Sequence, residues 1–433
     1  MNEYTVVVND CAAVAAVGGP TSIRTRDTVH GPKNFVLNLG YVTAGLPRQL
    51  NDREMDLAEI AGSLFAIDNA CARGHGDVEW GRAIEAHIPV RDPDYWTHLA
   101  PRLEAVFADF TQDRLDLTFH PDPQPNSAPR QRSSPFRPFD CVALISGGVD
   151  SYAGSLVLLE DGRRPLGVSH TAAGAITHAQ ARVAEVLTSK LPDFERVGLT
   201  AQKSGPTFPQ PEPSQRSRSF LFLAIASIAA AVGEVDDVFI NENGVMAVHI
   251  PLTAARAGSL STHTASPAVL ERLQGVLSDA VGSPVHINNN LLRHTKPEVV
   301  ALCRAMNQSD DLVNTVSCWS IGRTGRHCGS CAPCLMRRIS FELHGVPDVT
   351  YELDAFEDPE TLQIEFACDN LTHLVRVIQD LSTQSDLDLQ LSYPELLGGG
   401  RELSLVDTID LHRRWAREAS AVLGRYSVPA SIQ

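Results

Sequence analysis

The sequence predicts an α/β protein whose largest domain is a parallel, doubly wound sheet. An apolar, β-branched run over residues 141–145 stops at a glycine pair, and a helix-compatible segment follows over residues 152–159. Residues 165–169 and 177–187 repeat this order of strand and helix. A third apolar run, 238–240, leads into polar residues. Because strands joined by helices pair in parallel, the carboxyl ends of these runs meet at one edge of the sheet, where such folds bind ligands.

The loop after the first strand has the sequence SGGVDS, residues 146–151, which is typical of an anion site. Its glycines let the backbone turn without a Cβ clash, and its N–H groups point at a ligand together with those of the following helix. Ser146 and Ser151 add hydroxyl donors. Asp150 either holds Mg²⁺ beside a pyrophosphate or caps the helix. An ordinary strand-to-helix turn with capping serines is the alternative interpretation.

The composition of the 433-residue chain describes a well-buried globular protein of two or three domains, with 43% hydrophobic and 20% charged residues. A net charge of −16 disfavours non-specific nucleic-acid binding. No apolar run reaches membrane-spanning length and the N-terminus lacks the basic start of a signal peptide, so we expect a cytoplasmic protein. Nine cysteines, four of them in one short window, favour a metal site over a disulfide framework.

The sequence pattern divides the chain into four parts. Residues 1–122 are expected to form a small α/β accessory domain, with strands at 4–8, 35–42, 84–88 and 115–119 and helices at 52–72 and 95–110. Residues 123–138, rich in Pro, Arg and Ser, read as an extended linker. Residues 139–347 form the main domain. Residues 348–433 form a mostly helical extension, with helices at 371–381 and 406–423, that is expected to pack on the main domain.

The SGGVDS loop resembles the SGGxDS loop of the PP-loop ATP pyrophosphatases, which have the adenine nucleotide α-hydrolase-like fold. These enzymes adenylate a carboxylate or amide oxygen and release pyrophosphate. The Gly-Lys-Ser/Thr of a Walker A motif and the GxGxxG of a dinucleotide site are both missing from the loop. The resemblance implies ATP and Mg²⁺ as ligands, with the phosphates held by Ser146, Gly147, Gly148, Val149, Asp150 and Ser151.

The same resemblance assigns three further residues to the nucleotide. Ser169 and His170, at the end of the second strand, are expected near the adenine. Lys296, which follows Thr295, resembles the Thr-Lys pair that PP-loop synthases present to ATP phosphates, and a solvent-exposed lysine at a helix start is the alternative. We expect His178 and Gln180 to be helix-surface residues.

The second strong motif is a cysteine-rich segment over residues 318–334. Two overlapping Cys-x2-Cys steps bring three thiolates to one face, and a fourth cysteine completes a tetrahedron. The predicted ligands are Cys318, Cys328, Cys331 and Cys334. Four thiolates without an open position favour a structural Zn²⁺, and an iron–sulfur cluster is the alternative.

Together, the loop and the cysteine motif, followed by Met336-Arg337-Arg338, resemble the QueC family of 7-cyano-7-deazaguanine synthases over about residues 140–345. Arg218-Ser219 resembles an Arg-Asn pair of that family. A carboxylate at Glu242 suits a guanine-like N1–H and exocyclic amine, although an Asn-Gly turn explains this segment equally well. A hydroxyl-rich segment over 251–267 suits a loop that binds a polar ligand, and a solvent-exposed surface loop is the alternative. The predicted substrate contacts are Arg218, Ser219, Glu242, Asn243, Thr253, Arg256, Thr262 and His263.

The extra regions at both ends resemble the longer QueC-like proteins of bacterial antiphage operons, the QatC branch. The resemblance implies adenylation of 7-carboxy-7-deazaguanine and its coupling to an amine. The catalytic residues it implies are Ser146, Asp150, Ser151 and Lys296. We expect the amine to be the N-terminus of an operon partner protein, since the extra regions offer a docking surface. A synthase that uses ammonia is the first alternative. A tRNA-modifying PP-loop enzyme and a non-catalytic binding module are the others.

Overall fold

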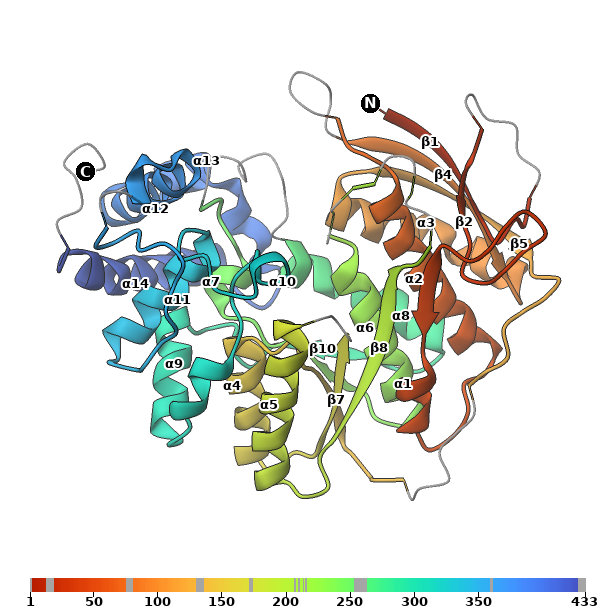
Figure 1. Ribbon diagram of the computed structural model, residues 1–433, viewed down its shortest axis with the longest axis horizontal. Coiled ribbons are helices and arrows are strands. Elements are labelled where there is room, and N and C mark those ends of the chain that lie inside the picture. The colour runs from red at the N-terminus through yellow and green to blue at the C-terminus, as the bar shows by residue number, and fades with distance from the viewer. Residues whose placement is uncertain are drawn as a thin grey trace.

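The computed structural model describes residues 2–12, 19–74, 81–129, 136–170, 174–205, 208, 211–212, 214, 216–252, 263–358 and 361–426. Within these residues the chain forms two sheets and a group of C-terminal helices (Figure 1). In the described part of the chain, no helix has both the length and the apolar composition needed to cross a bilayer.

The larger sheet has six strands, of which five are parallel. In spatial order it contains β10 (His286–Asn288), β9 (Asp237–Phe239), β6 (Cys141–Leu144), β7 (Pro165–His170), β8 (Glu195–Lys203) and β3 (Phe35–Asn38). This order confirms the predicted α/β architecture with parallel strands. The strand order reverses next to β6, and ligands bind at such reversals in open α/β sheets.

Helices cover both faces of this sheet. One face carries α4 (Val149–Glu160), α5 (Ala175–Lys190) and α9 (Lys296–Ala305), which share an apolar core with residues such as Ile145 and Phe194. The opposite face carries α6 (Arg218–Val232), α8 (Pro267–Val281) and α2 (Asp52–Ala70). Side chains alternate between the two faces along each strand, so neighbouring residues of β7 meet different helices.

The N-terminal region contributes a four-stranded parallel sheet, drawn at the upper right of Figure 1. Its spatial order is β2 (Thr21–Ile23), β1 (Asn2–Val8), β4 (Arg82–Val90) and β5 (Arg114–Pro121). The sheet packs against α2 and α3 (Pro93–Thr111), and one apolar core continues from it to the six-stranded sheet. The two sheets therefore pack around one common apolar core.

One predicted strand of the N-terminal region lies elsewhere. The expected strand over 35–42 is shorter, β3, and it pairs antiparallel with β8 of the larger sheet, with Phe35 opposite Lys203. The chain then turns into the short helix α1 (Gly40–Ala44). Phe35 is buried and packs on Phe65 of α2, with their ring centroids 6.3 Å apart, which fixes the strand against the shared core. An apolar run predicts a strand, but it does not say which sheet the strand joins.

The C-terminal helices form a third core next to the main sheet, at the upper left of Figure 1. The helices that contribute to this core are α7 (Gly244–Ala247), α11 (Ala332–Leu343), α12 (Glu365–Thr383), α13 (Asp386–Ser392) and α14 (Leu405–Leu423). Trp415 of α14 is completely buried among them. The short helix α10 (Ile321–Thr324) lies beside α5. Because α14 contacts α7, α9 and α11, the C-terminal helices support the main domain directly.

A close approach between α4 and the end of β9 gives a test of this packing. A Cβ atom at Gly154 of α4 would collide with the side chain of Asn241. We expect Gly154→Ala to lower the free energy of unfolding by about 1–3 kcal/mol, measured by urea denaturation, because an overpacked core must shift. Gly322→Ala is the matched control, since nothing lies within 4 Å of its Cβ position. Equal stability of the two variants would contradict this packing.

Candidate functional site

The SGGVDS loop lies where β6 ends and α4 begins. Gly147 has a φ of +81°, and Gly148 is the residue before α4, with no side chain capping the helix. The Ser146 hydroxyl accepts a hydrogen bond from Gly148 N at 3.2 Å and lies 3.0 Å from Ser151 Oγ. Ser146 is exposed and Gly148 is half-buried, so the loop is accessible from outside. Its backbone N–H groups and the start of α4 together form a cradle suited to phosphate.

A cluster of polar side chains lies beside this loop. Lys296 Nζ is 2.6 Å from Asp150 Oδ2, and both residues are buried. Asn243 donates to the same oxygen at 3.2 Å and to Glu242 Oε1 at 3.3 Å. These residues follow β6, β9 and β10, which are adjacent strands. The structure thus brings four side chains together at the carboxyl edge of the sheet: Asp150, Glu242, Asn243 and Lys296.

The two carboxyl groups of this cluster differ in electrostatics. Burial acts to raise the pKa of Asp150, but the Lys296 ammonium and the hydrogen bonds outweigh it and lower that pKa below its usual value. The pKa of Glu242 is raised well above its usual value, first by burial and then by the charge of Asp150. Two adjacent carboxyl groups with opposite shifts are typical of functional sites.

The arrangement suits a divalent cation next to phosphate. The second oxygen of Asp150, Oδ1, is buried and has no hydrogen-bond partner among the residues that the structure describes. A carboxylate oxygen beside a phosphate cradle is the type of ligand that Mg²⁺ uses. Asp150 and the loop therefore fit the Mg²⁺ and ATP expected from the sequence.

The end of β7 shows how the predicted adenine contacts are held. Ser169 is buried, accepts a hydrogen bond from Arg196 at 2.8 Å, and faces α5. His170 faces the opposite side, where its ring lies 5.5 Å from that of Phe222 on α6. Its pKa is lowered, first by burial, and Arg218 adds to this effect.

One residue near this strand end differs from the sequence prediction. The sequence predicts Gln180 on a helix surface, but the residue is buried, and its amide donates to the His170 carbonyl at 3.0 Å. The Cβ position of Gly147 lies 3.0 Å from the Gln180 backbone nitrogen, so α5 supports the loop from below. His178 is exposed, as expected. Only the three-dimensional approach of α5 to the loop identifies Gln180 as part of the site.

Arg218 is the first residue of α6 and is half-buried. Its guanidinium lies 5.6 Å from the centre of the Phe222 ring, and burial lowers its pKa. No carboxylate among the described residues forms an ion pair with it. A desolvated cation without a counter-ion suits an anionic ligand. Ser219 follows it and is half-buried.

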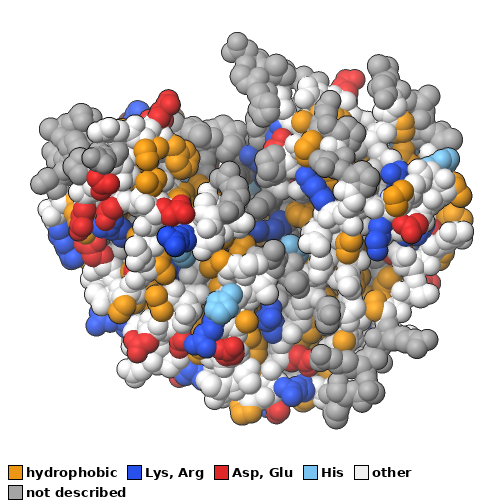
Figure 2. All heavy atoms as spheres, in the orientation of Figure 1, with side chains coloured by type: hydrophobic (Ala, Val, Ile, Leu, Met, Phe, Trp, Pro, Cys, Tyr) orange, Lys and Arg blue, Asp and Glu red, His pale blue; other side chains and the backbone are white. Residues whose placement is uncertain are grey.

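Of the remaining predicted substrate residues, the structure places His263 away from this group. His263 lies in a short 3-10 helix, His263–Ala265, and its Nδ1 is 3.2 Å from the Asp109 carbonyl of α3. Thr253, Arg256 and Thr262 lie outside the described residues. Figure 2 shows a hollow between the C-terminal helices on the left and the N-terminal region on the right, with basic and histidine side chains at its floor.

The four predicted cysteine ligands converge. The sulfur atoms of Cys318, Cys328, Cys331 and Cys334 all lie within 4.8 Å of one another. Backbone N–H groups of Ser320, Cys328 and Cys331 point at these sulfurs at 3.3–3.4 Å. This donor set fits a tetrahedral Zn²⁺, because thiolates are its usual structural ligands and N–H groups stabilise their charge. Gly329, with a φ of +80°, makes the required turn.

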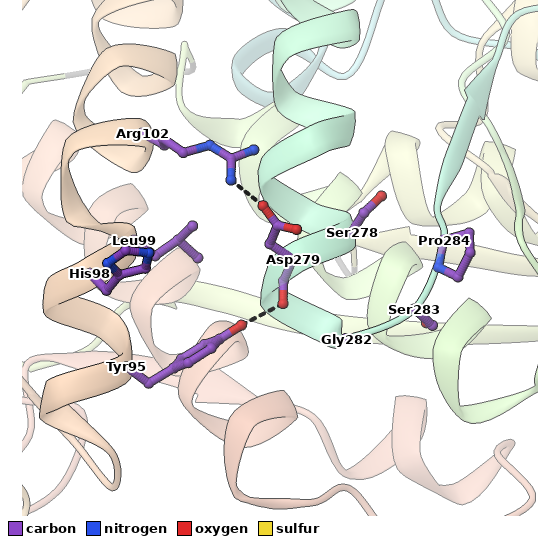
Figure 3. A pocket seen from close by; sticks show the side chains of 9 residues that line it. All are labelled: Tyr95, His98, Leu99, Arg102, Ser278, Asp279, Gly282, Ser283 and Pro284. Atoms are coloured by element: carbon purple, nitrogen blue, oxygen red, sulfur yellow. Dashed lines mark hydrogen bonds and ion pairs between the residues drawn. The ribbon is translucent and has the colours of Figure 1, made fainter.

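A pocket of about 660 Å³ lies elsewhere, between α3 and α8 (Figure 3). Asp279 occupies its centre, where its carboxylate pairs with Arg102 and its carbonyl accepts from the Tyr95 hydroxyl. The lining residues 282–284 precede β10, so the pocket lies at the amino edge of the sheet, opposite the loop. Tyr95 and Arg102 are thus already bound to Asp279 across the pocket.

The zinc assignment has a direct test. Cys331→Ser is expected to abolish about one equivalent of tightly bound zinc, measured on the purified protein by elemental analysis, because a tetrahedral site loses one of its four ligands. We also expect it to lower the melting temperature by several degrees, since metal binding adds to folding free energy. Cys368→Ser, at a half-buried cysteine outside the cluster, should leave both values unchanged.

The raised pKa of Glu242 predicts a pH-dependent stability. At pH values between the pKa of Glu242 in the unfolded chain and its higher pKa in the folded protein, the folded state binds more protons at this carboxyl. The contribution of Glu242 to the free energy of unfolding is therefore present below the unfolded pKa. It is lost as the pH rises through the folded pKa. We therefore expect Glu242→Gln, which is neutral at every pH, to gain stability relative to wild type as the pH rises above the ordinary glutamate range. Urea denaturation at several pH values measures this, and a constant difference would contradict it.

The comparisons with known proteins concern the region that holds both motifs. Residues 140–345 match the model of the family described as Queuosine biosynthesis protein QueC. A 7-cyano-7-deazaguanine synthase of Syntrophobacter fumaroxidans is 27% identical over 229 residues, covering 48% of this chain and 94% of the relative. A synthase of the same name from Nitrosococcus oceani is 26% identical over 228 residues, covering 48% of this chain and 96% of the relative. A third, from Hydrogenovibrio crunogenus, is 30% identical over 136 residues, covering 31% and 54%.

These matches agree with the geometry, since the matched region contains the phosphate cradle, the Asp150–Lys296 pair and the four cysteines. Residues 140–345 of this chain are therefore similar to the QueC family, an ATP-dependent ligase family.

Proposed function

We propose that the protein uses ATP to adenylate the carboxylate of a 7-deazaguanine and then joins the activated carbonyl carbon to an amine. The observation that carries the proposal is the buried Asp150–Lys296 pair beside the phosphate cradle, inside the region that matches the QueC family. The first step joins a substrate carboxylate oxygen to the α-phosphorus of ATP and breaks the bond to pyrophosphate. The second joins the amine nitrogen to the carbonyl carbon, releases AMP and loses a proton.

The residues have separate tasks in this scheme. The loop N–H groups and the hydroxyls of Ser146 and Ser151 would bind the phosphates. The Lys296 ammonium would neutralise charge that develops on pyrophosphate, while Asp150 holds that ammonium in place. Mg²⁺, bound through Asp150, would supply further neutralisation of the phosphate charge. Electrostatic stabilisation is therefore the main catalytic contribution.

Ammonia is the better-supported amine. The relatives described above are named 7-cyano-7-deazaguanine synthase, and two of them align over nearly their whole length. With ammonia the first product is an amide, and a second adenylation, now on the amide oxygen, allows loss of AMP and formation of a nitrile. The substrate would be 7-carboxy-7-deazaguanine.

The N-terminus of a partner protein is the second candidate amine, and with it the antiphage role of the QatC branch. The chain regions before residue 140 and after residue 345, outside the family match, favour this candidate. Part of these regions packs on the main domain, so that part supports the fold and is not free for docking a partner. Mass spectrometry of the operon partner, co-expressed with wild type or Ser146→Ala, distinguishes the two amines through a deazaguanine-sized adduct.

The remaining alternatives have simple tests. A tRNA-modifying enzyme would show a salt-sensitive affinity for tRNA, against the net charge of −16. A non-catalytic binding module would release no pyrophosphate from ATP and Mg²⁺ in the presence of 7-carboxy-7-deazaguanine.

Replacement of Lys296 tests the proposed chemistry. We expect Lys296→Ala to lower the rate of pyrophosphate release with ATP, Mg²⁺, 7-carboxy-7-deazaguanine and ammonia about 10²–10³-fold, because a preorganised charge is lost from the transition state. Lys190→Ala is the control, since Lys190 ends α5 and its nearest carboxylate, Glu160, is 4.0 Å away. Full activity of Lys296→Ala would overturn the assigned role.

A further inference from the structure

A fully buried group of charges lies in the N-terminal region, outside the matched family region. It consists of Asp68, Arg73, Arg82 and Asp113, each at most 4% exposed. Arg82 Nη2 lies 2.7 Å from Asp68 Oδ1 and 2.5 Å from Asp113 Oδ2. Arg73 donates to both oxygens of Asp113 at 2.9 Å. Burial of two carboxylates and two guanidiniums is costly, so such a group needs close pairing to persist.

One oxygen of this group reaches beyond the N-terminal region. Asp68 Oδ1 pairs with the arginines, while Oδ2 accepts hydrogen bonds from Ser217 N at 3.3 Å and Ser217 Oγ at 2.9 Å. Ser217 is the residue before α6, and its own side chain does not cap that helix. A carboxylate at this position satisfies free N–H groups and complements the positive end of the helix. Asp68 therefore caps α6 from a distant part of the chain.

Two more contacts fix the segment that leads to α6. Glu212 N donates to the Asn69 carbonyl at 2.9 Å, and a Glu212 carboxylate oxygen accepts from Arg73 N at 3.1 Å. Asp68 and Asn69 both belong to the last turns of α2. The end of α2 thus contacts residues 212 and 217, both of which precede α6 in the chain.

The residue immediately after this anchor is Arg218. It is the half-buried cation near His170 whose guanidinium pairs with no carboxylate in the described parts of the chain. Its backbone position follows from that of Ser217, because the two residues start the same helix. A displacement of Ser217 by about 1 Å would move the guanidinium relative to any ligand, and such shifts change rates strongly.

We propose that Asp68 is a positioning residue for Arg218, and that the N-terminal region thereby sets the affinity for the anionic deazaguanine substrate. The identity of that substrate rests on the proposed function. In this view Arg218 binds the carboxylate that becomes adenylated, and Asp68 acts through Ser217 without touching the ligand. The N-terminal region is then a working part of the substrate site and not only a covering layer.

The experiment compares two variants that disturb the same buried charges. Asp68→Asn and Asp113→Asn each remove one negative charge beside Arg82, but only Asp68 contacts Ser217. Both are expected to lower the melting temperature. Only Asp68→Asn should raise the KM for 7-carboxy-7-deazaguanine, by about tenfold, because it loses a hydrogen bond between Ser217 and a charged carboxylate. The KM for ATP should change less than twofold in both variants. Equal effects of the two variants on the deazaguanine KM would overturn the proposal.

A milder pair of variants covers the case in which the charge variants fail to fold. Ser217→Ala removes one hydrogen bond to Asp68 and leaves the charges intact, and we expect it to raise the deazaguanine KM about fivefold. Ser227→Ala, at a buried serine of the same helix whose hydroxyl has no partner among the described residues, is the matched control. An unchanged KM in Ser217→Ala would refute the role of this contact.

A double-variant cycle tests whether the effect passes through Arg218. If it does, Asp68→Asn combined with Arg218→Ala should have the deazaguanine KM of Arg218→Ala alone. Additive effects would exclude Arg218 as the intermediary. Failure of the proposed function is a separate result, because the wild-type protein itself would then release no pyrophosphate with this substrate.

Discussion

The ion pair between Asp150 and Lys296 is the interaction on which the candidate site depends. Its two partners follow different strands, β6 and β10, and β9 lies between these strands in the sheet. The pair therefore forms only when three parallel strands end at the same level. Once formed, the pair keeps the Lys296 ammonium beside the phosphate cradle. It also gives each of the two buried charges a partner of opposite sign. The polar residues after β9 complete the surroundings of the pair through Asn243.

Both flanking regions of the chain hold segments that carry site residues. At the N-terminal side, α2 binds the start of α6, where Arg218 lies. At the C-terminal side, Glu418 of α14 accepts from the Thr295 hydroxyl at 2.6 Å, and Arg414 contacts Glu298 at 3.1 Å. Thr295 and Glu298 form the capping box of α9, whose first residue is Lys296. Contacts from outside the family region thus fix two basic residues at the site.

The sequence predicts the parts of this structure that depend on local pattern. The SGGVDS loop, the convergence of the four cysteines, and helices such as α2 and α14 follow from glycine placement, ligand spacing and apolar periodicity. Partners that meet across the fold are not encoded in this way. Three contacts join residues that are far apart in sequence. Asn241 packs against Gly154, Gln180 is buried beside the loop, and Asp68 accepts hydrogen bonds from Ser217. Only the sheet topology decides those contacts.

The position of β3 affects what the main domain would expose without the N-terminal region. This strand comes from the first forty residues, yet it pairs with the outer side of β8 in the six-stranded sheet. A chain cut just ahead of β6 would leave the N–H and C=O groups of β8 open along that side and would strip α2 from the apolar surface of α6. Unprotected strand borders promote self-association. Residues 140–345 therefore rely on the N-terminal region to cover this strand border and the apolar surface of α6.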